Sequence, residues 1–328
     1  MDRKASSALF DLLAEPSVSF RRNLFLGALR HGAKRKCAGN GRFYLNIGHT
    51  GLNDPGLRDW VRRADVRPIY FVHDLIPVSH PQYCRAGERE RHIERMRTVV
   101  ETAAGVITNS QATIANLRQF ASEVRKPLAP TVAAWLGSTS LPASSPAPAD
   151  RPNFVTLGTV EARKNHILLL EVWGGLIEKL GSAAPRLTVV GQRGWEAQRA
   201  IEMLDREAFG DAVIEISDCD DAELARQLRA ARALLFPSFA EGFGMPLIEA
   251  FQAGVPAIAS DLPVFREIGQ GIPDLLDPTD RVAWQRAIED YSRADSVARN
   301  AQLRRLSSFE APTWDDHFAK VDSWLDTL

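Results

Sequence analysis

The stretch Phe236–Asp261, FPSFAEGFGMPLIEAFQAGVPAIASD, predicts the fold because it contains a strand end, a loop and a helix in succession. The apolar run ALLF (233–236) at its start has the character of a strand buried on both faces. A loop rich in Pro, Ser and Gly follows, and Pro246 favours the first turn of a helix because its fixed φ suits that position. A buried strand that leads through a loop into a helix is typical of an open parallel α/β sheet.

The loop of this stretch has the features of an anion-binding site. Gly242, Phe243 and Gly244 leave little side chain between the backbone amides and a ligand, and the helix dipole favours an anion there. Glu241 lies in the loop and Glu249 about one turn inside the helix, so both carboxylates can face a ligand docked on the helix end. A carboxylate can accept hydrogen bonds from two hydroxyls, which suits a sugar or a ribose. Taken singly, Glu249 can instead stabilise the first helical turn, and Glu241 can be a solvated loop charge.

The composition is that of an ordinary globular protein. With 328 residues, 45% hydrophobic and 25% charged, the chain can bury one large core or two medium ones, and we expect two domains. Its three cysteines are odd in number and in no C-x-x-C spacing, which favours neither a disulfide framework nor a zinc site and fits a cytoplasmic compartment. No apolar run reaches the about 18 residues of a membrane-spanning helix, and we expect no signal peptide.

Charge is unevenly distributed along the chain. The net charge is −1, but Lys and Arg outnumber Asp and Glu in residues 1–150, and the reverse holds in residues 151–328. This split favours two units with different surroundings, the basic one near something anionic, although one half can also simply complement the other. The segment 1–42 combines apolar residues with arginines. It can contact an anionic membrane surface peripherally, or it can form a core-facing helix with a solvated back.

Strand-like and helix-like segments alternate along most of the chain, which predicts parallel sheets covered on both faces. FYLNI (43–47) is predicted as a buried strand, and GHTG (48–51) after it as a loop at a cleft. Further strands are expected at 67–72, 105–110, 131–135, 153–158, 186–191 and 212–216, and helices at 57–63, 88–104, 112–121, 166–180, 195–208, 220–231, near 279–308 and at the C-terminus. Asp220 and Glu223 have capping-box spacing, so we interpret the SDCDD acidic run as a helix start rather than a metal site.

A Pro-, Ser- and Ala-rich stretch at 136–152 is the best linker in the chain. We therefore expect an N-terminal domain at 1–140, a linker at 141–152 and a C-terminal domain at 153–328, with the last helix packing back on the first domain. His73 and Asp74 come at the carboxyl end of strand 67–72, where open parallel sheets place their ligand sites.

The stretch 236–261 resembles the E-x7-E signature of the family 4 retaining glycosyltransferases, which have the GT-B fold. The EGFGMP core, the spacing of its two glutamates and the following AGVPAIASDLPVFREI carry the likeness. Other stretches resemble bacterial mannosyltransferase-like members of polysaccharide gene clusters: YLNIGHTGL (44–52), YFVHDLIPVSHPQYC (70–84), VITNSQAT (106–113), LGTVEARKNHILLLEVW (157–173) and GQRGWE (191–196). The resemblance implies two Rossmann-type domains facing a cleft, the first (1–140) on the acceptor side and the second (153–328) binding the nucleotide sugar. The N-terminal domain is expected to be shortened, because no strand is predicted before residue 43.

The resemblance also implies roles for particular residues. Lys164 and Arg163 would stabilise the donor diphosphate, Glu249 would bind the nucleotide ribose, and Glu241 would bind the donor sugar. The remaining expected site residues are the donor-binding Gly158, Thr159, Gly242, Phe243, Gly244 and Met245, the catalytic His73, and the acceptor-side Gly48, His49 and Asp74. Many family members have an arginine soon after the glycine at Gly158; here Thr159 stands next, which leaves Arg163 and Lys164 to contact the phosphates.

The function implied is a retaining glycosyltransferase that needs no metal or other cofactor. Its donor would be a nucleotide sugar, GDP-mannose favoured, and its acceptor a glycan or a lipid-linked glycan in polysaccharide biosynthesis. The expected route is front-face attack, with the leaving diphosphate taking the acceptor proton. A nucleotide-sugar epimerase of the same fold is an alternative enzyme, and a catalytically silent binding subunit is an alternative of another class. Neither a nucleic-acid partner nor a membrane-spanning segment is expected; we expect a cytoplasmic protein, with contact at the inner membrane face as an open alternative.

Overall fold

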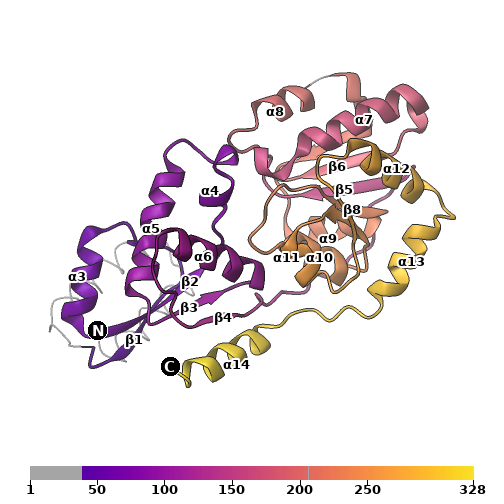
Figure 1. Ribbon diagram of the computed structural model, residues 1–328. Coiled ribbons are helices and arrows are strands. Elements are labelled where there is room, and N and C mark those ends of the chain that lie inside the picture. Colours follow the sequence, from indigo (N-terminus) through magenta and orange to yellow (C-terminus); the bar gives the residue numbers. More distant parts are fainter. Residues whose placement is uncertain (1–38, 206) are drawn as a thin grey trace, which may run out of the picture.

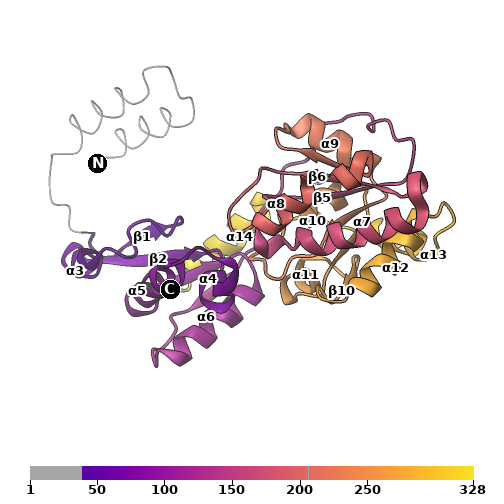
Figure 2. The same ribbon diagram turned by 90° about the horizontal axis from the view of Figure 1, so that it is seen from above.

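The computed structural model describes residues 39–205 and 207–328, which form two parallel β-sheets flanked by helices (Figures 1 and 2). The first sheet has the strand order β1-β2-β3-β4 and the second β10-β9-β8-β5-β6-β7. Every strand pair within both sheets is parallel. The predicted α/β class with parallel sheets is therefore confirmed.

The N-terminal lobe, defined here as residues 39–133, contains the first sheet. Its elements are β1 (Arg42–Asn46), α3 (Pro55–Ala64), β2 (Val66–Val72), α4 (Ile76–Ser79), η1 (Pro81–Tyr83), α5 (Glu88–Thr102), β3 (Gly105–Thr108), α6 (Gln111–Glu123) and β4 (Thr131–Ala133). The side chain of Asp54 caps α3, and that of Ser110 caps α6, by accepting a hydrogen bond from a first-turn amide.

The C-terminal lobe, defined here as residues 153–306, contains the second sheet. Its strands are β5 (Asn153–Leu157), β6 (Arg186–Val190), β7 (Val213–Ile216), β8 (Ala233–Phe236), β9 (Ala257–Ser260) and β10 (Asp274–Leu276). Its helices are η2 (Ala162–Lys164), α7 (His166–Leu180), η3 (Gly181–Ala183), α8 (Gln198–Leu204), η4 (Glu207–Ala212), α9 (Asp221–Ala230), α10 (Met245–Gln252), α11 (Pro263–Ile268), α12 (Arg281–Ser292) and α13 (Val297–Leu306). Asp220 caps α9 by accepting from the amide of Glu223, as the capping-box spacing predicts.

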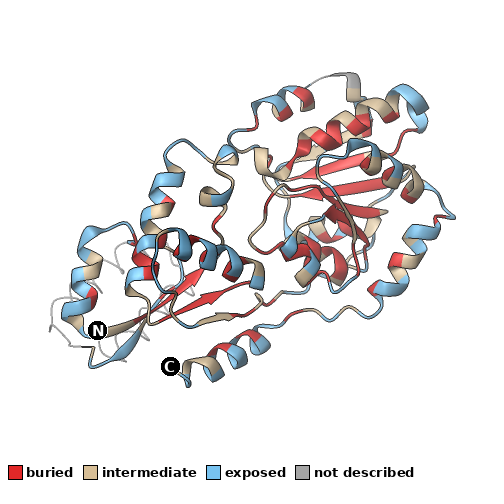
Figure 3. Cartoon of the chain, in the orientation of Figure 1, coloured by how far each residue is buried: buried red, intermediate tan, exposed pale blue. Residues whose placement is uncertain are grey.

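The centre of the second sheet is buried on both faces, and β8 is fully buried, as the apolar run at 233–236 predicts. Phe154 of β5 packs with Trp173 of α7 on one face, while the next residue, Val155, belongs to a cluster on the other face that includes Phe236. Successive side chains of a strand point to opposite faces, so this split requires helices on both sides. Figure 3 shows the central strands β5, β6, β8 and β9 as buried along most or all of their length, whereas the edge strands β7 and β10 are mostly half-buried.

Strand β1 is not the buried strand that its apolar sequence predicts. Phe43, Leu45 and Ile47 are 38%, 56% and 68% exposed to solvent. The reason is its place at the edge of the first sheet, where these alternate residues point to a side that the described residues leave open. The helix predicted at 195–208 is also shorter, because α8 starts only at Gln198.

The chain crosses between the lobes twice. The irregular segment 134–152 leads from β4 to β5 and is tied to α9, since Arg229 donates hydrogen bonds to the carbonyl oxygen of Pro142 and to Ser144. After α13 the chain returns, and α14 (Trp314–Leu325) lies alongside the N-terminal lobe (Figure 1). Val321 of α14 there joins a buried cluster with Ile69 and Phe71 of β2.

Among the described residues, no helix combines the length and the apolar character needed to cross a bilayer. Most of the segment 1–42, for which membrane contact is one of the two interpretations, lies outside the described residues.

Candidate active site

The strand order of the second sheet places its ligand site. Across the sheet, successive strands are added on one side in the order β5, β6, β7 and on the other side in the order β8, β9, β10. The order therefore reverses between the neighbours β5 and β8. Ligands of open α/β sheets bind outside the carboxyl ends of the strands at such a reversal. Gly158, Thr159, Arg163 and Lys164 follow β5, and the loop with Glu241 follows β8. The predicted donor-side residues therefore come from the two strands that flank the reversal point.

Glu241 is bound by both of the cations that follow β5. Its Oε1 accepts from Lys164 Nζ at 2.6 Å and its Oε2 pairs with Arg163 Nη1 at 2.7 Å, while Ser238 Oγ donates to Oε1 at 2.8 Å. The side chain of Glu241 is only 8% exposed. Arg163 also pairs with Glu161, which is equally buried. Two carboxylates and two cations thus form one compact, nearly neutral cluster.

The cluster keeps Glu241 ionised despite its burial. Burial alone would raise the pKa of Glu241, but Lys164 and then Arg163 outweigh it and lower the pKa below its ordinary value. Burial acts in the opposite sense on the guanidinium of Arg163, where Glu241 and Glu161 outweigh it and raise the pKa. At neutral pH Glu241 and Arg163 therefore both carry their charges.

Glu249 lies in a different environment from Glu241. Burial, helped by the negative charge of Asp221, raises the pKa of Glu249, and Lys164 opposes this rise only in part. Glu249 is the fifth residue of α10, the helix that follows the loop containing Gly242, Phe243 and Gly244. Gly244 has φ +116°, a conformation that favours glycine, and Met245 begins the helix there.

The N-terminal lobe meets the Glu241 loop at the end of β2. A Cβ on Gly242 would lie 2.7 Å from the carbonyl oxygen of His73 and 3.0 Å from Cβ of Asp74, so only glycine allows this approach. Asn109 donates a side-chain hydrogen bond to the same His73 carbonyl at 2.9 Å. The backbone at His73 and Asp74 therefore lies next to the loop that contains Glu241 and Gly242. The imidazole Nε2 of His73 lies 2.8 Å from the carbonyl oxygen of Ile47.

The expected acceptor-side residues Gly48 and His49 follow β1 and lie beside His73. The rings of His49 and His73 are 5.5 Å apart, and those of His49 and His92 are 5.6 Å apart. Burial, together with the charges of His92, His73 and Arg95, lowers the pKa of His49 to about 4, so this imidazole is neutral at pH 7. Its Nε2 is buried with no partner among the described residues. Gly48 is exposed.

Two cavities lie between the lobes at this point. One, of about 310 Å³, is lined by Asp74, Ile76, Pro77, Tyr83, Cys84, Arg85, Glu88, Glu161, Arg163 and Trp195. The other, of about 250 Å³, is lined by Ile76, Ser79, His80, Ala112, Ala115, Asn116, Phe239, Ala240, Glu241, Leu262, Pro263 and Val264. Both cavities combine residues of the two lobes. The charged cluster contributes Glu161 and Arg163 to the first and Glu241 to the second. Glu249, Gly158 and Thr159 line neither cavity.

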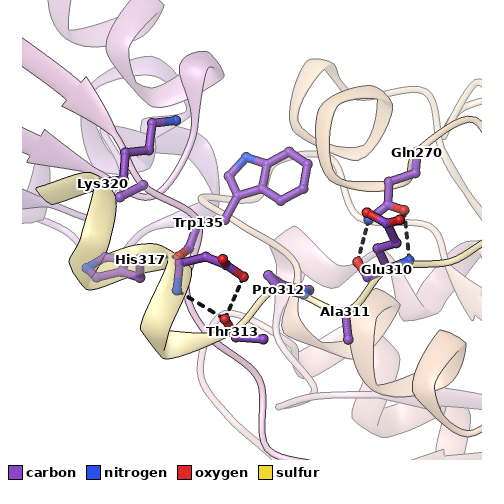
Figure 4. Close-up of a pocket in the computed structure, with 10 residues that line it drawn as sticks. Trp135, Gln270, Glu310, Ala311, Pro312, Thr313, His317 and Lys320 are labelled. Atoms are coloured by element: carbon purple, nitrogen blue, oxygen red, sulfur yellow. Dashed lines mark hydrogen bonds between the residues drawn. The ribbon is translucent and has the colours of Figure 1, made fainter. Parts of the chain in front are cut away.

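A third cavity, of about 540 Å³, lies away from the charged cluster, where α14 and the returning segment meet Trp135 and Gln270 (Figure 4). Its lining contains none of the residues predicted for the site. In the part of the chain that the structure describes, no group of His, Cys, Asp and Glu side chains has the arrangement of a metal site.

Several residues of the interface between the lobes were not predicted from the sequence. Arg85 lies 4.3 Å over the ring of Trp195, and Tyr83 stacks on Phe239 with ring centroids 4.9 Å apart. Glu161 and Ser238, which contact Arg163 and Glu241 in the charged cluster, were also missed, although each lies only two or three positions from its partner in the sequence. The stretch GQRGWE was singled out, but only for its resemblance, and Trp195 was expected to begin a helix.

Comparisons with solved structures define the fold class. The structure matches HepE from Anabaena, solved with UDP and glucose, with a TM-score of 0.66 at 15% identity, covering 87% of this chain and 78% of that one. It matches sucrose-phosphate synthase from Thermosynechococcus elongatus with a TM-score of 0.63 at 22% identity, covering 87% and 73%. The chain has the GT-B fold of glycosyltransferases.

Comparison of sequences identifies the family of the second half. The family described as glycosyl transferases group 1 matches residues 138–295, and this part of the chain is a glycosyl transferases group 1 domain. The chain is 30% identical over 230 residues to the serotype-specific mannosyltransferase WbdA of Escherichia coli, covering 65% of this chain and 28% of WbdA. It is 30% identical over 160 residues to the O-antigen chain mannosyltransferase B of Escherichia coli, and the match covers 49% of this chain and 42% of that protein. The chain thus spans less than half the length of these relatives.

Proposed function

We propose that the protein is a retaining glycosyltransferase that moves a hexose, mannose favoured, from a nucleotide sugar to a glycan or lipid-linked acceptor in polysaccharide biosynthesis. The observation that carries the proposal is the buried cluster of Glu241, Lys164 and Arg163 at the strand-order reversal of the second sheet, next to His73 of the N-terminal lobe. The names of the relatives support mannose, and hence GDP-mannose, as the donor.

The cluster is suited to a donor with a charged leaving group. Before the donor binds, Glu241 neutralises Lys164 and Arg163, and these cations pair with the diphosphate of the donor when it enters. Positive charge placed where negative charge develops lowers the barrier of group transfer. Because two protein cations are already present, the proposal needs no metal ion for this step.

Glu241 would then accept hydrogen bonds from hydroxyls of the donor sugar, and Glu249 from the ribose. The acceptor hydroxyl attacks the anomeric carbon from the side of the leaving group. The bond from this carbon to the diphosphate oxygen breaks, the bond to the acceptor oxygen forms, and the acceptor proton passes to the diphosphate. In this proposal His73 would act near the transferred sugar and the acceptor, and Gly48, His49 and Asp74 would bind the acceptor.

A panel of nucleotide sugars tests this function. Purified protein is incubated with each donor, with and without a lipid-linked glycan acceptor, and both free nucleotide and the anomeric configuration of the product are measured. Acceptor-dependent release of nucleotide from one donor, with the configuration retained, is the expected result. Turnover of donor without acceptor into an epimer would instead support an epimerase, and the absence of turnover with every donor would support a binding subunit.

Contact with the membrane surface is part of the proposal, since a lipid-linked acceptor lies there. The basic character of residues 1–150 favours attraction to anionic lipids. In flotation assays at low salt, vesicles with anionic lipids should bind the full chain, and salt should release it. Equal recovery with neutral and anionic vesicles would contradict this electrostatic contact.

A further inference from the structure

The N-terminus of α6 in the N-terminal lobe meets the C-terminal lobe at two points. The first is the loop after β8: Ser110 Oγ lies 3.2 Å and Thr113 Oγ1 3.5 Å from the carbonyl oxygen of Gly242. Gly242 follows Glu241 directly, so this contact fixes the position of the proposed sugar-binding loop relative to the first sheet.

The second point is the carboxylate of Glu267 in α11. Its Oε1 accepts from the amide of Gln111 at 2.8 Å, and its Oε2 accepts from the amide of Ala112 at 3.1 Å. The first amides of a helix have no partner within the helix, and the helix dipole favours a negative charge beside them. Glu267 thus caps a helix of the other lobe.

Trp135 extends this contact to the connection between the lobes. Its indole Nε1 donates to Glu267 Oε1 at 2.9 Å, and its carbonyl oxygen lies 2.8 Å from Nδ1 of His317 in α14. Figure 4 shows the indole between the N-terminal lobe and the Gln270 side of the C-terminal lobe. One carboxylate therefore links α6, α11 and the start of the crossing segment.

The helix that contains Glu267 also packs on the sugar-binding loop. Phe265 of α11 is fully buried, and a Cβ on Gly244 would lie 2.7 Å from its ring. Since the interior is close-packed, α11 cannot shift against α6 without moving Gly244 and Gly242 relative to His73. The position of Glu267 and the geometry of the cleft are coupled.

We infer that Glu267 is a positioning residue that sets the register of the two lobes at the proposed active site, by capping α6 from across the cleft. The inference rests on the proposed function for its consequence in catalysis. Glu267 contributes no group to the donor in this arrangement, so it should affect sugar transfer and not the affinity for nucleotide.

The test compares Glu267→Ala with Glu289→Ala, a control that removes an ion pair to Lys179 within the C-terminal lobe. Glu267→Ala should lower kcat/KM for transfer by about tenfold to a hundredfold, because misplacing reacting groups by about 1 Å costs this much. Its affinity for nucleoside diphosphate, measured by calorimetry, should stay within about twofold of the wild-type value. A change of this size is small, because each tenfold change in affinity corresponds to about 1.4 kcal/mol. Small-angle scattering should show a larger radius of gyration. The control should match the wild type in all three.

A second variant separates positioning from general loss of structure. Trp135→Phe keeps an aromatic side chain and removes the indole donor. Its effect on transfer should be non-additive with that of Glu267→Ala, because both act through one contact. Glu267→Gln, which keeps one acceptor oxygen, should recover part of the transfer rate. Unchanged transfer and an unchanged radius of gyration in Glu267→Ala would overturn the inference, as would a parallel loss of nucleotide affinity. If the wild type transfers no sugar, the proposed function fails, while scattering still tests the contact.

Discussion

Lys164 and Glu241 are joined by a hydrogen bond of 2.6 Å between Nζ and Oε1, although they lie 77 positions apart in the chain. Both side chains are nearly buried, at 10% and 8% exposed. Removing one partner of a buried ion pair usually leaves an uncompensated charge. Here Arg163 and Ser238 still bind Glu241 when Lys164 is lost, so the site can survive the substitution and its chemistry can be measured.

We predict that Lys164→Ala lowers kcat for sugar transfer by about a hundredfold or more, the scale of removing one group that stabilises developing charge. Nucleotide affinity should fall as well, because Lys164 binds the diphosphate in the proposed ground state. Steady-state kinetics and calorimetry measure the two effects. Lys179→Ala, which removes an exposed ion pair, is the matched control. Wild-type turnover by Lys164→Ala would show that this cation does not act on the leaving group.

We predict that donor turnover proceeds without a divalent metal ion. Lys164 and Arg163 supply two positive charges where the diphosphate would leave, which is the task that a metal performs in other transferases. Turnover should therefore be the same after treatment with a chelator as before. Loss of activity with chelator, reversed by magnesium or manganese, would contradict the prediction.

The sequence predicts the parts of the site better than their assembly. The run EGFGMP and the pair Arg163 and Lys164 are local patterns, so a single stretch of chain is enough to find them. The contact of Lys164 with Glu241 depends on β5 and β8 being neighbours, which is a property of strand order that no local pattern contains. Glu267 shows the same limit, because in the sequence it is one more charge near the end of a short helix. The exposure of Leu45 was missed because an apolar strand has the same sequence at the edge of a sheet as inside it.

We predict that His166 makes the protein less stable as the pH falls. The residue is 3% exposed, neither ring nitrogen has a partner among the described residues, and burial, with Lys164, lowers its pKa to about 4. The unfolded chain, with a histidine pKa of about 6.5, binds more protons between about pH 6.5 and pH 4, so the free energy of unfolding falls over that range, by about 3 kcal/mol at most.

His166→Leu should remove this part of the pH dependence. It should also be neutral or stabilising at pH 7.5, since a buried polar group without a partner costs about 1–3 kcal/mol. Urea unfolding of both proteins at pH 7.5 and pH 5 measures the difference. An equal loss of stability in the wild type and the variant on acidification would show that His166 is not responsible.

We predict that Glu241→Gln impairs recognition of the donor sugar, whereas Glu249→Ala impairs binding of the nucleotide. Glu241→Gln should bind free nucleoside diphosphate at least as tightly as the wild type, because Lys164 and Arg163 lose a neutralising charge, but it should use the intact donor poorly, because only the donor has sugar hydroxyls. Glu249→Ala should lower the affinity for free nucleoside diphosphate, because the proposed partner of Glu249 is the ribose of the nucleotide. Calorimetric titration of the diphosphate, alongside donor turnover, measures both.

The raised pKa of Glu249 adds a dependence on pH to the same titration. A protonated carboxyl accepts fewer hydroxyl hydrogen bonds than a carboxylate, so diphosphate affinity in the wild type should rise as the pH increases through a range above the ordinary glutamate value. The pKa of Glu241 is lowered, so Glu241→Gln should keep this profile, whereas Glu249→Ala should lose it. If Glu241→Gln loses diphosphate binding while Glu249→Ala retains both the affinity and its pH dependence, the two roles have been assigned to the wrong carboxylates.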